Sequence, residues 1–226
     1  MARLGSWIEP FPEGIYVRPA DAWIDPSQPK PRALVTHGHA DHARGGHGRV
    51  WATPETLAIM ECRYGSQNGS KVDYGEIVRM DGVEIGFVPA GHVLGSAQIV
   101  LDYQGERVVV SGDYKRRPDP TCAPFEPVPC DIFITEATFG LPVFRHPDTG
   151  SEIDRLLHRL HSDPSRCVLV GAYALGKAQR VITELRRRGH EQPIYYHGAV
   201  ERLCRLYEEL GVPLGEMRHT ASATKA

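Results

Sequence analysis

The sequence lacks the features that would assign it to a membrane, to the secretory pathway or to a disulfide-bonded scaffold. It has no apolar run of roughly 18 residues and no apolar stretch behind its N-terminus, so we expect a soluble, cytoplasmic protein. Its 5 cysteines are odd in number and show no Cys-x-x-Cys spacing, which predicts free thiols and no structural zinc site. At 226 residues the chain is long enough to bury a full hydrophobic core.

The sequence also lacks an excess of positive charge. Its formal net charge is −2, so bulk charge does not indicate a nucleic-acid-binding protein. Positive charge is instead clustered, first at Lys115-Arg116-Arg117 and again at Arg186-Arg187-Arg188. Such clusters are solvated surfaces more often than binding sites. Both interpretations stay open here, because each cluster follows one of the motifs described below.

The densest group of metal-binding side chains follows an apolar run at 33–35, which predicts a buried strand. The group consists of His37, His39, Asp41 and His42. In an extended segment residues i and i+2 point the same way, so His37 and His39 can share one ion while Asp41 and His42 serve a second. Imidazole and carboxylate ligands suit zinc, manganese or iron.

Two further candidate ligands stand at the ends of predicted strands. The turn Asp81-Gly82 predicts a hairpin whose second strand runs out just before His92. Another predicted hairpin, formed by 97–101 and 107–110, ends before Asp113. At the end of the sheet, His92 would be the third imidazole for the first ion. A carboxylate at the end of a strand can contact two ions, one through each oxygen.

Two polar residues near these ligands have a structural and a functional interpretation. Asp25 precedes a proline and is typical of a turn start, which we favour, although its carboxylate could also orient a metal-bound imidazole. His47 lies in the Gly-rich segment after the motif and outside its ligand spacing, so we expect it to be a polar loop residue.

From Gly150 the pattern changes to alternating helices and strands. The apolar spacing predicts helices at 152–161, 177–188 and 201–210, and strands at 167–170 and 193–196. The loop 171–177 has the spacing G-x-x-x-x-G-K, but Ala178 replaces the Ser or Thr that would hold magnesium, which argues against a nucleotide-hydrolysing enzyme. A helix N-terminus with free N–H groups and Lys177 could still hold a nucleic-acid phosphate, and His197 could add a second contact.

Together these motifs resemble the nucleic-acid-cutting branch of the metallo-β-lactamase fold. The resemblance is carried by residues 37–42, Gly91-His92, and the segments 111–114, 131–140 and 172–179. It runs from about Trp7 to Val212. It is greatest to the family of ligase-associated DNA damage response exonucleases, relatives of the Artemis-like and the cleavage-and-polyadenylation nucleases.

The resemblance implies an α/β fold, with a metallo-β-lactamase αββα sandwich over residues 1–149 and a partial β-CASP-like αβ segment over 150–226. It also implies two divalent metal ions, zinc first and manganese as the alternative. The implied ligands are His37, His39 and His92 for one ion, Asp41 and His42 for the other, and Asp113 between the two. The implied catalytic residues are Asp41, Asp113 and Glu136, the last by orienting a ligand or contacting substrate, and the phosphate-binding residues are Lys177 and His197.

The implied function is hydrolysis of phosphodiester bonds with a metal-activated water, by a DNA exonuclease in DNA repair. DNA is the implied partner, an ATP-dependent DNA ligase and a helicase are functional associates, and no membrane is involved. Members of the family continue past the point where this sequence ends, with an extension whose histidine completes the second metal site. We therefore interpret the sequence as truncated and expect the second ion to be held weakly.

Three alternatives remain open. A lactonase- or thioesterase-type hydrolase of the same fold would carry the same metal motif, but not the segment 172–179, its basic neighbours or Glu136. An RNA nuclease would share all of these features. A non-catalytic fragment that binds nucleic acid is the third alternative, since the C-terminal histidine is missing.

Overall fold

The computed structural model of the chain describes residues 5–163 and 165–222. It divides into two compact units, Met1–Glu136 and Ala137–Ala226. The division falls just after the last strand of the first unit, earlier in the chain than the boundary at residue 150 suggested by the sequence. Among the described residues, none of the helices has the length and apolar character that a bilayer crossing would need.

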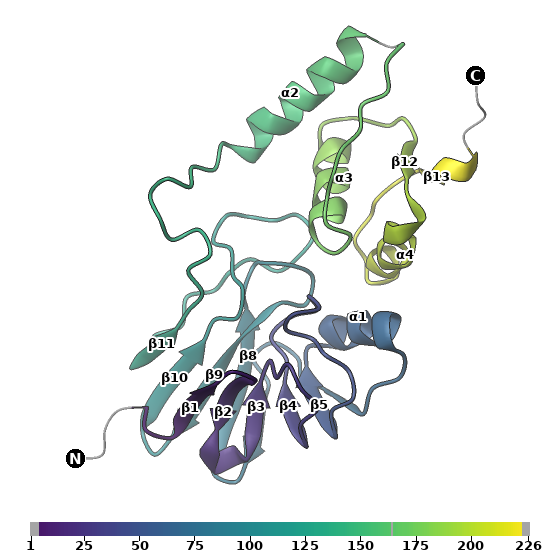
Figure 1. Cartoon of the computed structure of the whole chain (residues 1–226). Helices are drawn as coiled ribbons and strands as arrows, with labels where there is room; N and C mark the ends of the chain where they lie inside the picture. The colour runs from purple at the N-terminus through teal and green to yellow at the C-terminus, as the bar shows by residue number, and fades with distance from the viewer. Residues whose placement is uncertain (1–4, 164, 223–226) are drawn as a thin grey trace. The chain divides into compact units, whose positions relative to one another are not determined.

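The first unit contains two β-sheets (Figure 1). The strands of one sheet, in spatial order, are β1 (Ile8–Phe11), β2 (Gly14–Val17), β3 (Ala22–Ile24), β4 (Arg32–Leu34), β5 (Arg49–Ala52) and β6 (Gly69–Lys71), with the 3-10 turn η1 (Arg18–Ala20) between β2 and β3. The first three strands pair antiparallel, and β3 to β6 pair parallel. Strands β4 and β5 therefore end at the same edge of the sheet.

The other sheet has the order β11 (Ile132–Ile134), β10 (Glu106–Val110), β9 (Ala97–Tyr103), β8 (Val83–Pro89), β7 (Ile77–Met80). Both predicted hairpins are present, as β7–β8 and β9–β10. In the first hairpin the turn residue Asp81 has φ 49°, the left-handed conformation that an Asp-Gly turn favours. Strand β11 pairs parallel with β10, so both strands also end at one edge.

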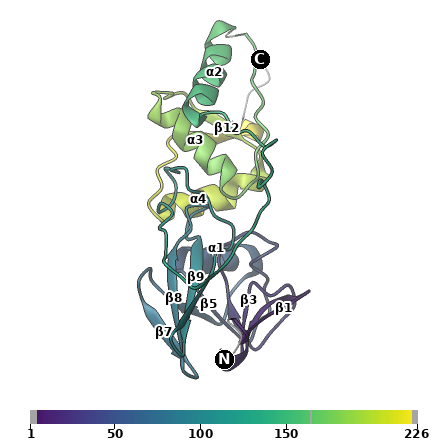
Figure 2. The same cartoon turned by 90° about the vertical axis from the view of Figure 1, so that its left-hand side faces the viewer.

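The two sheets pack against each other through one apolar core. Leu34 of the first sheet and Phe87, Ile99 and Leu101 of the second are fully buried in it. Burying each such side chain stabilises the fold by about 1.5–3 kcal/mol, so the strand ends are firmly positioned. Helix α1 (Pro54–Tyr64) packs on the other face of the first sheet, over β4 and β5 (Figure 2).

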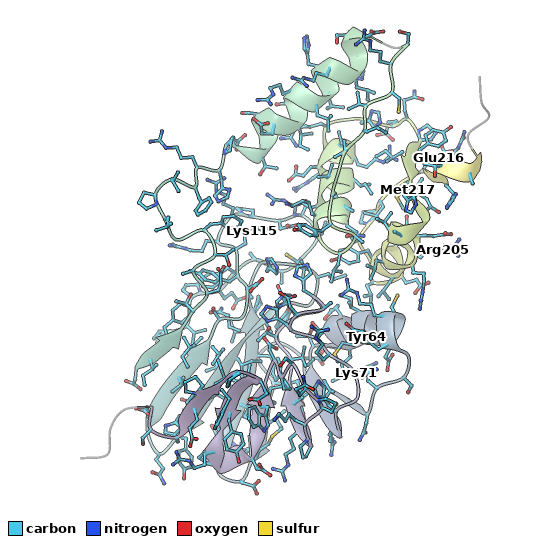
Figure 3. The ribbon with its side chains drawn as sticks, in the orientation of Figure 1. Tyr64, Lys71, Lys115, Arg205, Glu216 and Met217 are labelled. Atoms are coloured by element: carbon cyan, nitrogen blue, oxygen red, sulfur yellow. The ribbon has the colours of Figure 1, made fainter. Side chains whose placement is uncertain are left out.

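The second unit combines helices with a two-stranded parallel sheet. Its elements are α2 (Thr149–Ser162), α3 (Lys177–Arg187), β12 (Ile194–Tyr196), η2 (Gly198–Val200), α4 (Glu201–Glu209), β13 (Met217–His219) and η3 (Thr220–Ser222). Near the C-terminal end of α3, Arg186 donates hydrogen bonds to carbonyl oxygens in the segments that lead into β12 and β13; Figure 3 labels Glu216 and Met217 at the second of these segments. The N-terminal end of α3 therefore points toward the carboxyl ends of both strands.

Two predictions for local structure are wrong. The segment Cys167–Val170 forms no strand and pairs with none of the described strands, and Leu169 is 91% exposed. Residues 65–70 are rich in Gly, Ser and Asn, a composition that predicts a loop, yet Gly69 and Ser70 belong to β6 and pair with β5. In both cases the outcome depends on a pairing partner distant in the sequence, which local apolarity does not reveal.

Candidate metal centre

The metal loop, residues 36–42, leaves the carboxyl end of β4 and is held in place by α1. A Cβ atom on Gly38 would lie 2.6 Å from the Ile59 side chain of α1, so only glycine fits at this close approach. The Arg63 guanidinium donates a hydrogen bond of 3.0 Å to the Gly38 carbonyl oxygen. Helix and loop are therefore fixed against each other.

His92 and Asp113 come from the other sheet, on the loops that follow β8 and β10. The His92 N–H donates to Ser96 Oγ at 3.0 Å, which shapes the first loop. The Lys115 N–H donates to the Ala90 carbonyl oxygen at 3.0 Å, which joins the two loops. Gly91 lies between them with φ 71° and leaves no room for a Cβ beside the Lys115 carbonyl. These contacts hold His92 next to Asp113.

Four ligand atoms converge at one point. The distances are 3.0 Å from His37 Nε2 to His39 Nδ1, 3.1 Å from His39 Nδ1 to His92 Nε2, 3.6 Å from His92 Nε2 to Asp113 Oδ2 and 3.9 Å from His37 Nε2 to Asp113 Oδ2. Ligands about 2.0–2.1 Å from a zinc ion in a tetrahedron lie about 3.4 Å apart. The spacing and the chemistry of these donors fit one divalent ion.

The other oxygen of Asp113 faces a second, more open group. Asp113 Oδ1 lies 3.4 Å from His42 Nε2, and Asp41 Oδ2 lies 3.8 Å from the same nitrogen. The Asp41 side chain is 78% exposed, so this group is open to solvent on its side. Asp113 thus directs one oxygen to each group, as a bridging carboxylate would.

Asp25 is not only a turn residue, the role that the sequence favoured. Its carboxylate accepts hydrogen bonds from the Thr36 N–H at 2.7 Å, the Thr36 hydroxyl at 2.6 Å and His42 Nδ1 at 2.8 Å. The Thr36 Oγ in turn lies 3.0 Å from His37 Nδ1. This Asp25 network gives both histidines a partner at Nδ1, so each Nε2 is free to face an ion. The nearness of Asp25, His37 and His42 is therefore best explained as support for the ligands.

Three of the four residues of the first group, His37, His92 and Asp113, are unprotonated at neutral pH. Burial, and then the charges of His42, His92 and His39, lower the pKa of His37 well below 6.5. Burial, followed by the charge of His39, lowers the pKa of His92 to about 4. A hydrogen bond from His42 is the main cause that lowers the pKa of Asp113. These three ligands need not lose a proton before they bind a cation.

His42 differs from these three residues because its imidazole is positively charged at neutral pH. Burial acts to lower its pKa, but hydrogen bonds to Asp113 and Asp25 outweigh burial and raise the pKa to about 10. His42 therefore holds a proton at neutral pH. An ion at His42 Nε2 would have to displace that proton.

Three other polar residues near the motifs lie outside the converging groups. Glu136 follows β11 and is half-buried, but it belongs to neither group. His47 is buried and accepts a hydrogen bond from the Lys30 N–H at 3.2 Å, as a loop residue would. Lys115 (labelled in Figure 3) forms an ion pair with the buried Asp119, so this member of the basic cluster holds its own loop.

The predicted phosphate contacts belong to the second unit. The idea of free N–H groups at the start of α3 is wrong. The N–H groups of Gly176, Lys177 and Ala178 donate to Gln179 Oε1, the Leu175 oxygen and the Tyr173 oxygen, respectively. The Lys177 side chain is exposed, with Nζ 5.4 Å from the centre of the Tyr173 ring.

His197 keeps a donor for a ligand. Its Nδ1 accepts a hydrogen bond from the Ala199 N–H at 3.2 Å, which leaves the proton of the neutral ring on the exposed Nε2. Because α3 begins toward the carboxyl ends of β12 and β13, Lys177 and His197 stand at the same edge of the second unit. A side-chain site for phosphate is compatible with this arrangement.

Fold and site together define a mixed α/β protein with a cluster of metal-binding side chains at strand ends. No family model matches the chain. A protein of Opitutus terrae named probable DNA ligase is 29% identical, over 96% of this chain and 22% of its own length. The cleavage and polyadenylation specificity factor subunit 3-I of Arabidopsis thaliana is 28% identical, over 87% of this chain and 34% of its own length.

Two further comparisons agree with these. A ribonuclease of Thermus thermophilus is 28% identical, over 78% of this chain and 48% of its own length. The solved structure of a protein of unknown function from Enterococcus faecalis V583 shares the fold, with a TM-score of 0.59 and 12% identity over 86% of this chain and 52% of that one. The chain is thus similar to proteins named for nucleic-acid cleavage or ligation, and it spans less than half the length of these three curated relatives.

Asp25→Asn should weaken metal binding by roughly 10–100-fold, the usual effect of losing a partner that orients a ligand. Asparagine tolerates the φ of 46° at this position but cannot accept all three hydrogen bonds. The measurement is metal affinity by calorimetry. Asp21→Asn is the matched control, because Asp21 has a similar φ of 44°. Its carboxylate accepts a hydrogen bond from the Tyr16 hydroxyl at the surface and lies outside both ligand groups. Equal affinities for both variants would contradict the role of Asp25.

Proposed function

We propose that the chain is a metal-dependent hydrolase of phosphodiester bonds in nucleic acid, and more specifically a DNA exonuclease of DNA repair in the cytoplasm. The convergence of His37, His39, His92 and Asp113 is the observation that carries the proposal. A cluster of imidazoles and a carboxylate that follows the strand ends suits a hydrolytic metal centre.

In this proposal His37, His39, His92 and Asp113 would hold one ion, and Asp41, His42 and Asp113 a second. When bound, such ions supply Lewis-acid stabilisation of charge on the phosphoryl oxygens and lower the pKa of water. The chain itself positions the ligands through the Asp25 network and leaves the side of Asp41 open to substrate. The catalytic residues are Asp41, Asp113 and Glu136, with zinc as the first choice of metal and manganese as the second.

The same proposal covers the architecture. Residues 1–149 would be the metallo-β-lactamase αββα sandwich, which two packed sheets and α1 support. Residues 150–226 would be the partial β-CASP-like segment, which carries Lys177 and His197 as contacts for substrate phosphates.

The choice of nucleic acid as substrate rests on the relatives. Two of them are an RNA-processing factor and a ribonuclease by name, and a third, matched over nearly the whole of this chain, is named as a DNA ligase. The last supports DNA as substrate and a functional association with a ligase, to which the proposal adds a helicase. An RNA nuclease is the second candidate, favoured by the names of the other two.

The test is an assay of the purified chain on end-labelled DNA and on RNA of the same sequence. We expect stepwise removal of nucleotides from DNA, loss of activity with a chelator and recovery with zinc or manganese. Hydrolysis of a lactone or thioester without any cleavage of nucleic acid would contradict the proposal. Binding of DNA without cleavage at saturating metal would do so too, in favour of a non-catalytic fragment.

Lys177→Ala should weaken DNA binding and reduce the salt dependence of its affinity by about one phosphate contact. The exposed ammonium at the start of α3 is the group removed. Hydrolysis of a small chromogenic phosphodiester, too short to reach Lys177, should stay the same. Lys71→Ala, which removes another exposed lysine (labelled in Figure 3), is the control. Equal losses on DNA and on the small substrate would rule out a phosphate contact at Lys177.

A further inference from the structure

A second group of charged side chains lines a cavity at the opposite end of the first unit. The cavity has a volume of about 560 Å³, and Arg32, Arg49, Trp51, Arg79 and Asp81 are among the residues that line it. Arg32 and Arg49 are the first residues of β4 and β5, whereas the metal loop follows the other end of β4.

The turn between β7 and β8 supplies the other wall of this cavity. His92 follows the far end of β8, a strand of seven residues. At about 3.3 Å per residue, cavity and metal ligands lie about 20 Å apart. The cavity is therefore a separate site within the first unit.

The cavity carries positive charge that the described residues do not fully neutralise. Arg32 and Arg49 are direct partners on neighbouring parallel strands, and like charges so placed repel each other. Arg32 forms an ion pair of 2.7 Å with Asp81, and Arg79 forms one of 2.8 Å with Glu84.

Arg49 has a different environment. Its Nε donates to Ser70 Oγ at 2.9 Å, and its guanidinium lies 4.9 Å from the centre of the Trp51 ring. In the part of the chain that the structure describes, Arg49 has no carboxylate within ion-pair distance. A guanidinium held over an aromatic ring, beside a second arginine, is suited to an incoming anion.

We propose that this cavity binds the phosphate group of a nucleotide. Guanidinium groups bind phosphate in a bidentate manner, and an anion between Arg32 and Arg49 would relieve their repulsion. The volume lies within the range of about 300–1,000 Å³ that is usual for small-molecule sites. The indole of Trp51 holds the Arg49 guanidinium at the cavity. Asp81 pairs with Arg32 through Oδ2 and keeps Oδ1 as an acceptor for an amino group of a base.

Calorimetry on the metal-loaded chain tests this site with three probes: deoxyadenosine 5′-monophosphate, deoxyadenosine and inorganic phosphate. We expect the nucleotide to bind, phosphate to bind more weakly and the nucleoside not to bind. Arg49→Gln should weaken nucleotide binding at least about tenfold, the effect of losing one charge-assisted pair of hydrogen bonds. Arg107→Gln is the control, because it removes an arginine of the same unit that is paired with Asp102 at the surface.

Two further variants make the result specific. Arg49→Lys keeps the charge but loses the planar fork, so it should recover only part of the affinity. Trp51→Leu should weaken the binding of both the nucleotide and phosphate, because it removes the ring that holds the Arg49 guanidinium. If Arg49→Gln binds the nucleotide as tightly as the parent chain, or if the nucleoside binds as tightly as the nucleotide, the assignment is wrong. DNA hydrolysis by Arg49→Gln should stay at the parent rate, so the outcome here is independent of the proposed nuclease function.

Discussion

Asp113→Asn should reduce metal-dependent DNA hydrolysis by at least about 10²–10³-fold, the effect of removing one electrostatic group from an active site. The two oxygens of Asp113 face the two ligand groups, Oδ2 toward His92 and Oδ1 toward His42. Asparagine keeps the shape of the side chain but removes its charge and one of its two acceptor oxygens. Asp41→Asn should also lower activity strongly, because it removes the exposed ligand of the second group.

The measurement is the rate on end-labelled DNA, with thermal unfolding of each variant as a check on the fold. Asp73→Asn is the control, since Asp73 is an exposed loop carboxylate outside both ligand groups. Protein purified free of contaminating nuclease is essential here. A rate equal to that of the parent for Asp113→Asn would show that this residue does not bridge two ions.

The chain should bind one divalent ion tightly and a second more weakly, and the second should release about one proton. The pKa values of His37, His92 and Asp113 are lowered, so the first ion meets ligands that have already lost their protons. His42, with a pKa raised to about 10, is protonated below that pH. The affinity of the second site should therefore rise by about tenfold per pH unit from pH 7 toward pH 10 and fall as the pH is lowered.

Calorimetry in buffers of different ionisation enthalpy measures both the affinities and the protons released. Asp25→Asn offers an internal comparison, because it removes one of the two carboxylate partners that hold the proton on His42. This variant should release less than one proton on binding the second ion. Two ions bound with equal, pH-independent affinity would contradict the difference between the two groups and would indicate an additional ligand.

The convergence of His37, His39, His92 and Asp113 could be predicted from the sequence because the signals for it are local. His37 and His39 alternate along one segment, and Asp81-Gly82 defines the hairpin that leads to His92. For Asp25 the sequence favoured a turn and offered support of a metal-bound imidazole only as the second interpretation. This support depends on the parallel pairing of β3 with β4, which brings the Asp25 carboxylate beside Thr36 and His42. Such pairing joins residues whose local sequences carry no sign of each other.

The second unit also shows where prediction from the sequence stops. The G-x-x-x-x-G-K spacing correctly places a loop before α3. It could not reveal that the side chain of Gln179 and the loop carbonyls already accept the N–H groups at that helix start. Likewise, the apolar residues of 167–170 are typical of a strand, but a strand needs an edge to pair with.

The origin of the four converging ligands has a consequence for how the fold holds together. His37 and His39 extend the first sheet, whereas His92 and Asp113 extend the second. An ion held by all four would link the rims of the two sheets, and folding and metal loading would become one coupled equilibrium. Chelation should then raise amide hydrogen exchange at residues 36–42, 90–96 and 111–115 together. The hairpin turns at the opposite rim should keep their protection, so the unit would loosen from one end only.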